Sequence, residues 1–143
     1  MTTLNTYLTF NGNCEEAFLF YKSVFGGEYA HIARFSEMPY NPDCVISEED
    51  KNKIMHVSLP ISKETVLMGS DTSGEWASQF NQGNNFSISI SVDSKDAADT
   101  FFNKLSKDGK VIMPMDKTFW GSYFGMFVDK YGIQWMVGYD ELH

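Results

Sequence analysis

Basic residues are scarce in this 143-residue sequence, which has 11 Lys and Arg against 19 Asp and Glu, and a formal net charge of -8. Nucleic-acid affinity rests on clustered Lys and Arg, so this balance argues against a nucleic-acid partner and against anionic membrane surfaces. Long apolar runs are also missing, and none approaches the roughly 18 residues of a membrane span. The first residues lack the features of a signal peptide, so we expect a cytoplasmic protein.

Only two cysteines are present, Cys14 and Cys44, and neither belongs to a CxxC motif. In a reducing compartment we expect both to be reduced, structural thiols. Cys14 falls in the first turn of an expected helix, where the helix dipole can lower a thiol pKa. A reactive thiol at Cys14 is therefore the alternative interpretation.

The familiar catalytic motifs are missing too. The sequence contains no GxGxxG, P-loop, HExxH or GxSxG motif, which argues against a Rossmann nucleotide or S-adenosylmethionine site and against a serine hydrolase. The histidines are His31, His56 and His143, and we expect the last residue, His143, to be disordered. His56 has three open interpretations: a hydrogen-bonded structural residue, a ligand contact or a metal ligand.

What the chain does contain is an internal repeat. A strand-like run at 7–10 precedes an amphipathic helix pattern, and about eighty residues later the run 86–92 precedes a second one. Further strand-like runs follow each helix, so each half has the order β-α-β-β-β. We expect a single α+β domain made of module one at 1–71, a connector at 72–84 and module two at 85–143. The expected strands are 3–10, 28–36, 53–61, 65–70, 86–92, 110–115, 121–128 and 133–139.

Local patterns place the helices and the orientation of one strand. Asn13 is an expected N-cap with Glu16 as its capping-box partner. The apolar stripe of this first helix should be Ala17, Phe20, Tyr21, Val24 and Phe25. The second helix is expected near 94–107. In the run 53–61, alternation directs Met55, Val57 and Leu59 toward a helix, and Ile54, His56 and Ser58 toward the opposite side.

Several segments together resemble PhnB-like proteins of the vicinal oxygen chelate superfamily, which includes glyoxalase I, bleomycin-resistance proteins and extradiol dioxygenases. The matching runs are 7–17, 20–27, 53–59, 67–71, 119–125 and 129–135, so the resemblance spans nearly the whole chain. It implies a glyoxalase-like fold in which two βαβββ modules form curled mixed sheets around a cavity. It also implies a homodimer.

Enzymes of that superfamily hold a divalent metal with ligands from the first and last strands of each module. The resemblance maps these positions onto Asn5 or Tyr7, Met68 (Leu67 in a shifted register), Ser87 and Met136. Thioethers and hydroxyls are poor ligands for Zn, Mn, Ni or Fe, which prefer imidazole or carboxylate. With His56 as the only nearby nitrogen donor, we expect no metal at this site and no cofactor.

The remaining cavity would be apolar with a few hydroxyl groups, which suits a small, partly apolar organic ligand. Three functions follow: a metal-free small-molecule binding protein similar to bleomycin-resistance members, an isomerase- or lyase-type enzyme using His56 or Tyr7 as general acid or base, and an interaction module without a ligand. The candidate ligand-contacting residues are Tyr7, His56, Met68, Ser87, Trp120, Phe124 and Met136.

Overall fold

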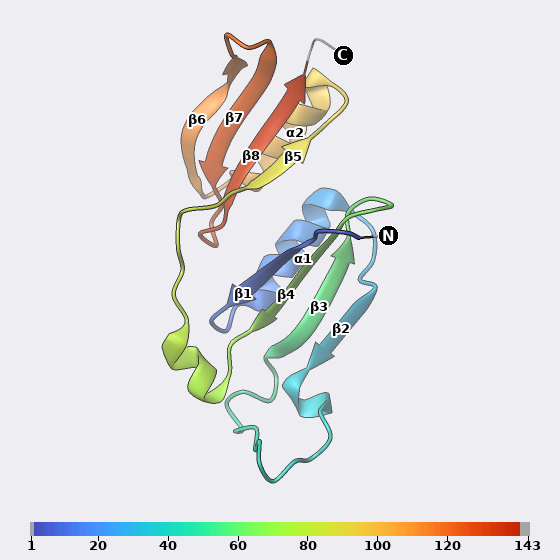
Figure 1. The fold of residues 1–143 in the computed structure, drawn as a ribbon, viewed down its shortest axis with the longest axis vertical. Coiled ribbons are helices and arrows are strands. Elements are labelled where there is room, and N and C mark those ends of the chain that lie inside the picture. The colour runs from blue at the N-terminus through green and yellow to red at the C-terminus, as the bar shows by residue number, and fades with distance from the viewer. Residues whose placement is uncertain (1, 141–143) are drawn as a thin grey trace. The chain divides into compact units, whose positions relative to one another are not determined.

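The computed structural model describes residues 2–140, without the side chains of Glu75 and Trp76. The chain divides into two compact units, residues 1–81 and 82–143, and each is described by itself. Figure 1 shows that both units are built from a sheet and one α-helix. Within the described residues, no helix is long and apolar enough to cross a membrane.

The first unit forms one four-stranded mixed sheet in the order β1-β4-β3-β2. The outer strand β1 runs parallel to β4, whereas the β4–β3 and β3–β2 pairs are antiparallel. The parallel pairing sets the first strand of the unit beside its last, so that Tyr7 lies opposite Met68. The elements of this unit are β1 (Thr6–Phe10), α1 (Cys14–Phe25), β2 (His31–Arg34), the short 3₁₀ helix Phe35–Glu37, β3 (Ile54–Pro60), β4 (Val66–Asp71) and the 3₁₀ helix Gly74–Gln79.

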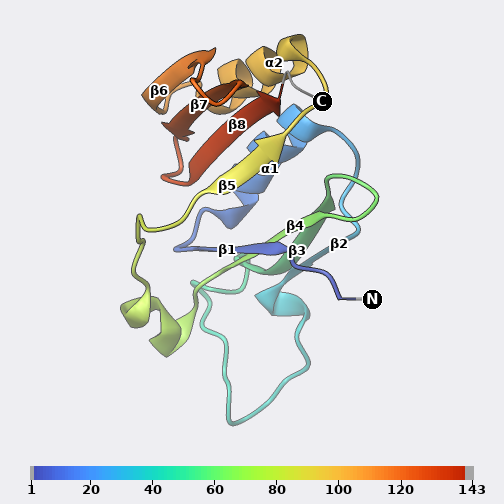
Figure 2. The same cartoon turned by 45° about the horizontal axis from the view of Figure 1, so that its top comes forward.

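The second unit repeats this plan, with the sheet order β5-β8-β7-β6 and a parallel β5–β8 pair. Its helix α2 runs along one face of the sheet, as the turned view in Figure 2 shows. The elements are β5 (Ile88–Ser91), α2 (Lys95–Leu105), β6 (Lys110–Lys117), β7 (Ser122–Val128) and β8 (Gln134–Asp140). The expected α+β fold of two βαβββ modules with mixed sheets is confirmed. The 3₁₀ helix Gly74–Gln79, within the expected connector, was not foreseen.

The core of the first unit lies between α1 and one face of its sheet. Leu8, Val57, Leu59 and Leu67 are buried on that face, and Phe18 of α1 is fully buried against it. The predicted helix stripe was therefore partly wrong. Ala17 and Tyr21 are buried as expected. Cys14 and Phe18 are also buried but were not predicted. The remaining members of the predicted stripe are only half-buried: Phe20, Val24 and Phe25.

A glycine in β4 makes room for the ring of Phe18 against the sheet. A Cβ atom on Gly69 would lie 2.6 Å from Cε1 of Phe18 and 3.0 Å from the carbonyl oxygen of Leu8, so only glycine leaves room for this ring. The second unit uses the same device, since a Cβ on Gly125 would lie 2.8 Å from Cε2 of Phe102 in α2. In both units, a phenylalanine of the helix packs on a glycine of the sheet.

The start of α1 is held by a residue far away in the sequence. Asn13 stands at the N-cap but its side chain makes no capping hydrogen bond, so the expected capping box with Glu16 was wrong. Instead, Oδ1 of Asp71 at the end of β4 accepts hydrogen bonds of 2.9 Å from the backbone N–H groups of Gly12 and Cys14. Its Oδ2 accepts a third, from Ile54 N–H at the start of β3. One buried carboxylate therefore fixes three segments of the unit.

We predict that Gly69→Ala destabilises the protein, because the added methyl group cannot fit without moving Phe18 or the β1 backbone. The free energy of unfolding from urea denaturation should fall by about 1–3 kcal/mol. Gly83→Ala is the matched control, since its Cβ would meet only Asn85 Oδ1, at 3.6 Å. Equal stabilities of the two variants would contradict the close packing of Phe18 on the sheet.

Candidate functional site

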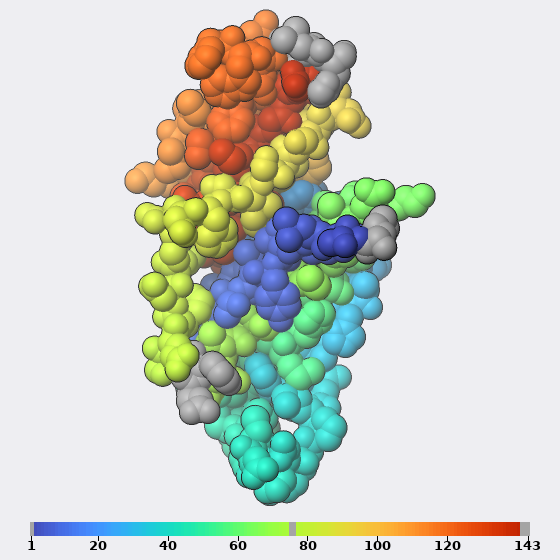
Figure 3. All heavy atoms as spheres, viewed as in Figure 1, coloured from blue at the N-terminus to red at the C-terminus, as the bar shows by residue number. Residues whose placement is uncertain are grey.

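Each sheet has one face that its α-helix covers and one that it does not, which we call the helix-free face. In the first unit, a row of side chains across all four strands lies on this face: Tyr7, Met68, Ser58 and His31. Figure 3 shows atoms of β1, in blue, at the surface of this unit. Tyr7 is 47% exposed and Met68 is half-buried, so this row forms an open surface with both aromatic and apolar character.

A bulge in β3 determines where its side chains point. Ala33 pairs with His56, but the next residue of β2, Arg34, pairs with Ile54, so Met55 is the extra residue. His56 therefore lies on the helix-free face, as expected, together with Ser58. The expectation that Ile54 shares this face was wrong, because the bulge turns Ile54 into the core, where it is fully buried.

Three ring side chains from three strands meet on the helix-free face of the first unit. Nδ1 of His56 lies 3.0 Å from Nδ1 of His31, within hydrogen-bond distance. The ring centroid of Tyr7 lies 5.9 Å from that of His56, on the side of β1. His56 thus lies between a second imidazole and a phenol. The three rings offer two imidazoles, which can donate or accept protons, and one aromatic ring for contact with a ligand.

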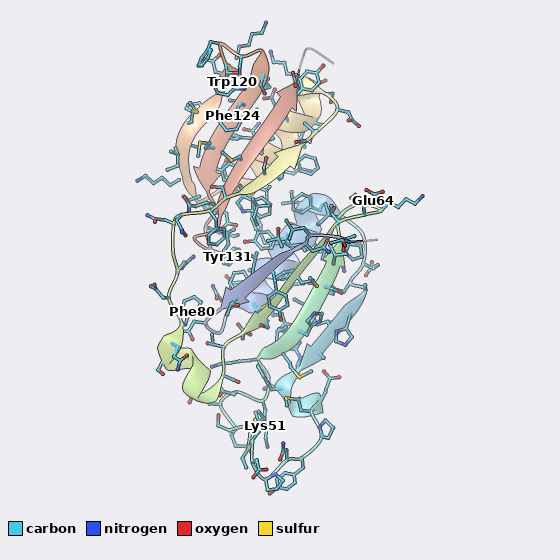
Figure 4. All side chains as sticks on the ribbon, viewed as in Figure 1. Lys51, Glu64, Phe80, Trp120, Phe124 and Tyr131 are labelled. Atoms are coloured by element: carbon cyan, nitrogen blue, oxygen red, sulfur yellow. The ribbon has the colours of Figure 1, made fainter. Side chains whose placement is uncertain are left out.

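The second unit carries methionines on the corresponding face. Ser89, Met136, Met126 and Met113 form one row across β5, β8, β7 and β6. Phe124 lies on the same face, one row along, and Trp120 of the preceding turn packs against it with ring centroids 6.2 Å apart. Figure 4 shows these two labelled side chains near each other in the second unit. Trp120 is 54% exposed, which makes a large aromatic surface available.

The structure thus places six of the seven candidate residues on the helix-free faces or, for Trp120, beside one. Ser87 is the exception, because it precedes β5, and Ser89 is the serine opposite Met136. The sequence reasoning also overlooked residues that complete the two rows: His31, Ser58, Ser89, Met113 and Met126. The sequence shows that His31 lies in an expected strand, but its pairing with His56 depends on the strand register. His143 lies outside the described residues.

The chemistry of the mapped metal positions differs from that of a borderline divalent site. Tyr7 and Met68 face each other in the first unit, and in the second Met136 lies opposite Ser89, two residues beyond the mapped Ser87. These side chains supply a phenol, two thioethers and a hydroxyl, but neither a carboxylate nor an imidazole. The residues at the mapped positions therefore do not fit a Zn, Mn, Ni or Fe ion. They do fit apolar and aromatic ligand surfaces.

Comparison with known proteins now places the chain. Residues 2–138 match the model of the family described as 3-demethylubiquinone-9 3-methyltransferase. The chain belongs to this family. Protein YjdN of Escherichia coli strain K12 is 27% identical over 140 residues, which cover 94% of this chain and 92% of that protein. The family description names a methyltransferase, whereas this sequence has no GxGxxG loop of an S-adenosylmethionine site.

Solved structures agree with the resemblance in fold. Protein PA1353 of Pseudomonas aeruginosa is similar with a TM-score of 0.81 and 37% identity over 98% of both chains. A putative 3-demethylubiquinone-9 3-methyltransferase, PhnB protein, of Bacillus cereus has a TM-score of 0.73 and 26% identity, covering 96% of this chain and 99% of that one. A glyoxalase/bleomycin resistance protein/dioxygenase family enzyme of Burkholderia phytofirmans PsJN shares the fold, with a TM-score of 0.63 and 15% identity over 94% and 95% of the chains.

The thiol of Cys14 is not part of either helix-free face. Cys14 is the first residue of α1 and is fully buried, and its pKa is raised far above the usual thiol range, first by burial and then by the charges of Asp71 and Glu15. These effects outweigh the helix dipole that made a reactive thiol an alternative. Cys44, in contrast, is exposed.

We predict that a thiol reagent such as dithionitrobenzoate labels Cys44 rapidly and leaves Cys14 unmodified in the native protein at pH 8. The release of one thionitrobenzoate per chain, rising to two in denaturant, would be measured by absorbance. Cys44→Ser provides the control and should abolish native labelling. Rapid native labelling of Cys44→Ser would show that Cys14 is accessible and reactive.

Proposed function

We propose that this protein binds a small, partly apolar organic molecule on the helix-free faces of its sheets, without a metal at the four mapped positions. One observation carries the proposal: these faces present partly exposed aromatic and methionine side chains, while each helix covers the opposite face. Large aromatic residues such as Tyr7 and Trp120 contribute much of the energy of a binding surface when a ligand covers them.

The second unit offers mainly apolar contacts. Met113, Met126 and Met136 lie in one cross-strand row, beside Phe124. Methionine is flexible and polarizable, so such a row adapts to ligands of irregular shape and makes favourable contacts with flat aromatic rings. This composition favours a ligand with an aromatic or hydrocarbon portion.

The first unit, taken by itself, offers mainly polar contacts. Tyr7, Ser58 and the pair His31 and His56 lie on one face and can donate or accept hydrogen bonds. A ligand with a carbonyl, hydroxyl or carboxylate group is therefore the best match. A few polar groups within an apolar surface are typical of small-molecule sites.

The same rings support a second candidate function, an isomerase- or lyase-type enzyme. His56 lies between Tyr7 and His31, so a general base and a general acid are available on one face. Once a ligand is known, His56→Gln would separate the two functions. An enzyme loses turnover in this variant, whereas a protein that only binds shows none in either form.

We expect substitutions on the helix-free faces to weaken ligand binding. Native mass spectrometry of the protein mixed with a small-molecule extract of its source cells would identify the ligand, and calorimetry would then measure its affinity. Tyr7→Ser should weaken binding to the first unit, and Phe124→Ser binding to the second, at least about tenfold, because each removes an aromatic contact.

Leu19→Ser is the matched control. Leu19 lies on α1, away from the helix-free face, and its exposed fraction of 55% is close to the 47% of Tyr7. It should leave the affinity unchanged. An extract from which the protein retains no small molecule, or equal affinities for all three variants, would contradict the proposed function.

We also propose a homodimer. Edge strands of open sheets need pairing or protection, and β6 is an edge strand with an exposed apolar run, Val111, Ile112 and Met113. Light scattering at micromolar concentration should give a mass of twice 16.3 kDa. A mass of 16.3 kDa would contradict the dimer.

A further inference from the structure

We propose that His31 and His56 form a two-imidazole chelate for an exchangeable borderline divalent ion, with Cu²⁺ bound more tightly than Zn²⁺ or Ni²⁺. The site lies where β2 pairs with β3. The metal positions implied by the superfamily resemblance lie instead in the first and last strands of each module. The proposed chelate uses the same two imidazoles that the proposed ligand would contact, but binding of the ion does not require the organic ligand.

The sheet itself brings the two histidines together. His31 lies directly opposite Ser58, and His56 is two residues before Ser58 in β3. The two histidines are therefore diagonal neighbours on the same face of an antiparallel pair, within reach for side chains of this length. Because both stand on paired strands, their backbones are fixed before any ion arrives.

The distance between the two rings matches the bite of a metal chelate. Zinc–imidazole bonds are about 2.0–2.1 Å long, so two nitrogens in adjacent positions at 90° are about 2.9 Å apart, and at the tetrahedral angle about 3.3 Å. The measured Nδ1–Nδ1 distance is 3.0 Å. The spacing of the two nitrogens therefore suits a chelate, and a rotation of the rings would turn both lone pairs toward an ion beside the line that joins them.

In the free protein, a hydrogen bond joins the two nitrogens that would hold the ion. One ring donates its Nδ1–H to the Nδ1 of the other, which lies 3.0 Å away. On binding, the donor ring takes the tautomer with its hydrogen on Nε2, by exchange with water, and both Nδ1 lone pairs face the ion. No net proton is lost from a neutral pair, and no other reactant is needed.

Tyr7 helps to fix one of the two ligands. Its ring packs against His56 from the β1 side, with a centroid separation of 5.9 Å, and restricts the rotation of that imidazole. Two protein ligands leave the remaining coordination positions to water or to a donor atom of another molecule. The bound ion is therefore exchangeable, and gel filtration into metal-free buffer should remove it.

The test is a titration of tag-free protein with Cu²⁺ and, separately, Zn²⁺, followed by calorimetry and electron paramagnetic resonance. We expect one Cu²⁺ per chain with a dissociation constant of about 10 µM or below, and weaker Zn²⁺ binding, as the Irving–Williams order requires. The copper spectrum should show coupling to two imidazole nitrogens. His31→Gln and His56→Gln should each weaken binding at least about tenfold, because each removes one of two ligands.

Two matched controls separate this site from others. His143→Gln removes the third histidine of the chain, and Met136→Leu removes a thioether from the helix-free face of the second unit. Neither should change the affinity. Unchanged binding in His31→Gln or His56→Gln would overturn the proposal, as would loss of binding in His143→Gln.

The spectrum of the unmodified protein decides the question even if a variant fails to fold. Circular dichroism of each variant would show whether it folds. A copper spectrum with one imidazole nitrogen or none, or a protein that takes up no Cu²⁺ at millimolar concentration, would also overturn the proposal.

Discussion

The constraint on which this structure depends is that one α-helix covers only one face of a four-stranded sheet. In the first unit, α1 covers the sheet face that carries Leu8, Val57 and Leu59. The core of the unit lies between this face and the helix. The opposite face has no helix of its own. Ser58 is buried there, but other side chains of that face remain at least partly exposed: Tyr7, His31, His56 and Met68. Large apolar side chains left in this state are most often found where a ligand or another protein binds. The fold thus places the core of each unit on one face of its sheet and leaves the other face open to the proposed ligand.

The two units share the contacts that hold the helix on one face of the sheet, although the surrounding residues differ. In each unit a parallel pair joins the first and last strands, and a helix phenylalanine packs on a sheet glycine, Phe18 on Gly69 and Phe102 on Gly125. Each unit also has a buried aspartate after or at the end of a strand. Asp71 accepts three backbone N–H bonds, and Asp129 accepts two, together with Nε1–H of Trp135. The helix-free faces, in contrast, have diverged into a face with histidines and one with methionines.

The order of elements and the class of fold could be predicted from the sequence. They depend on the periodicity of apolar residues, and the two halves of the chain show the same order of strand and helix patterns. The side of His56 also followed from alternation. The failures have local causes. The bulge at Met55 reverses Ile54, and alternation cannot reveal an extra residue in a strand. The cap of α1 comes from Asp71, 57 residues beyond Cys14, so no local motif encodes it. The His31–His56 pair depends on strand register, which the sequence does not fix.

The central claim is that the helix-free faces are binding surfaces and do not simply complete a core. A crystal structure of the protein purified from its source cells, without added ligand, tests this claim most directly. We expect ordered density for a small organic molecule in contact with Tyr7 and Met68, or with Phe124 and Met136. A structure in which protein side chains alone fill the space over both faces would contradict the account, and would favour an interaction module without a ligand.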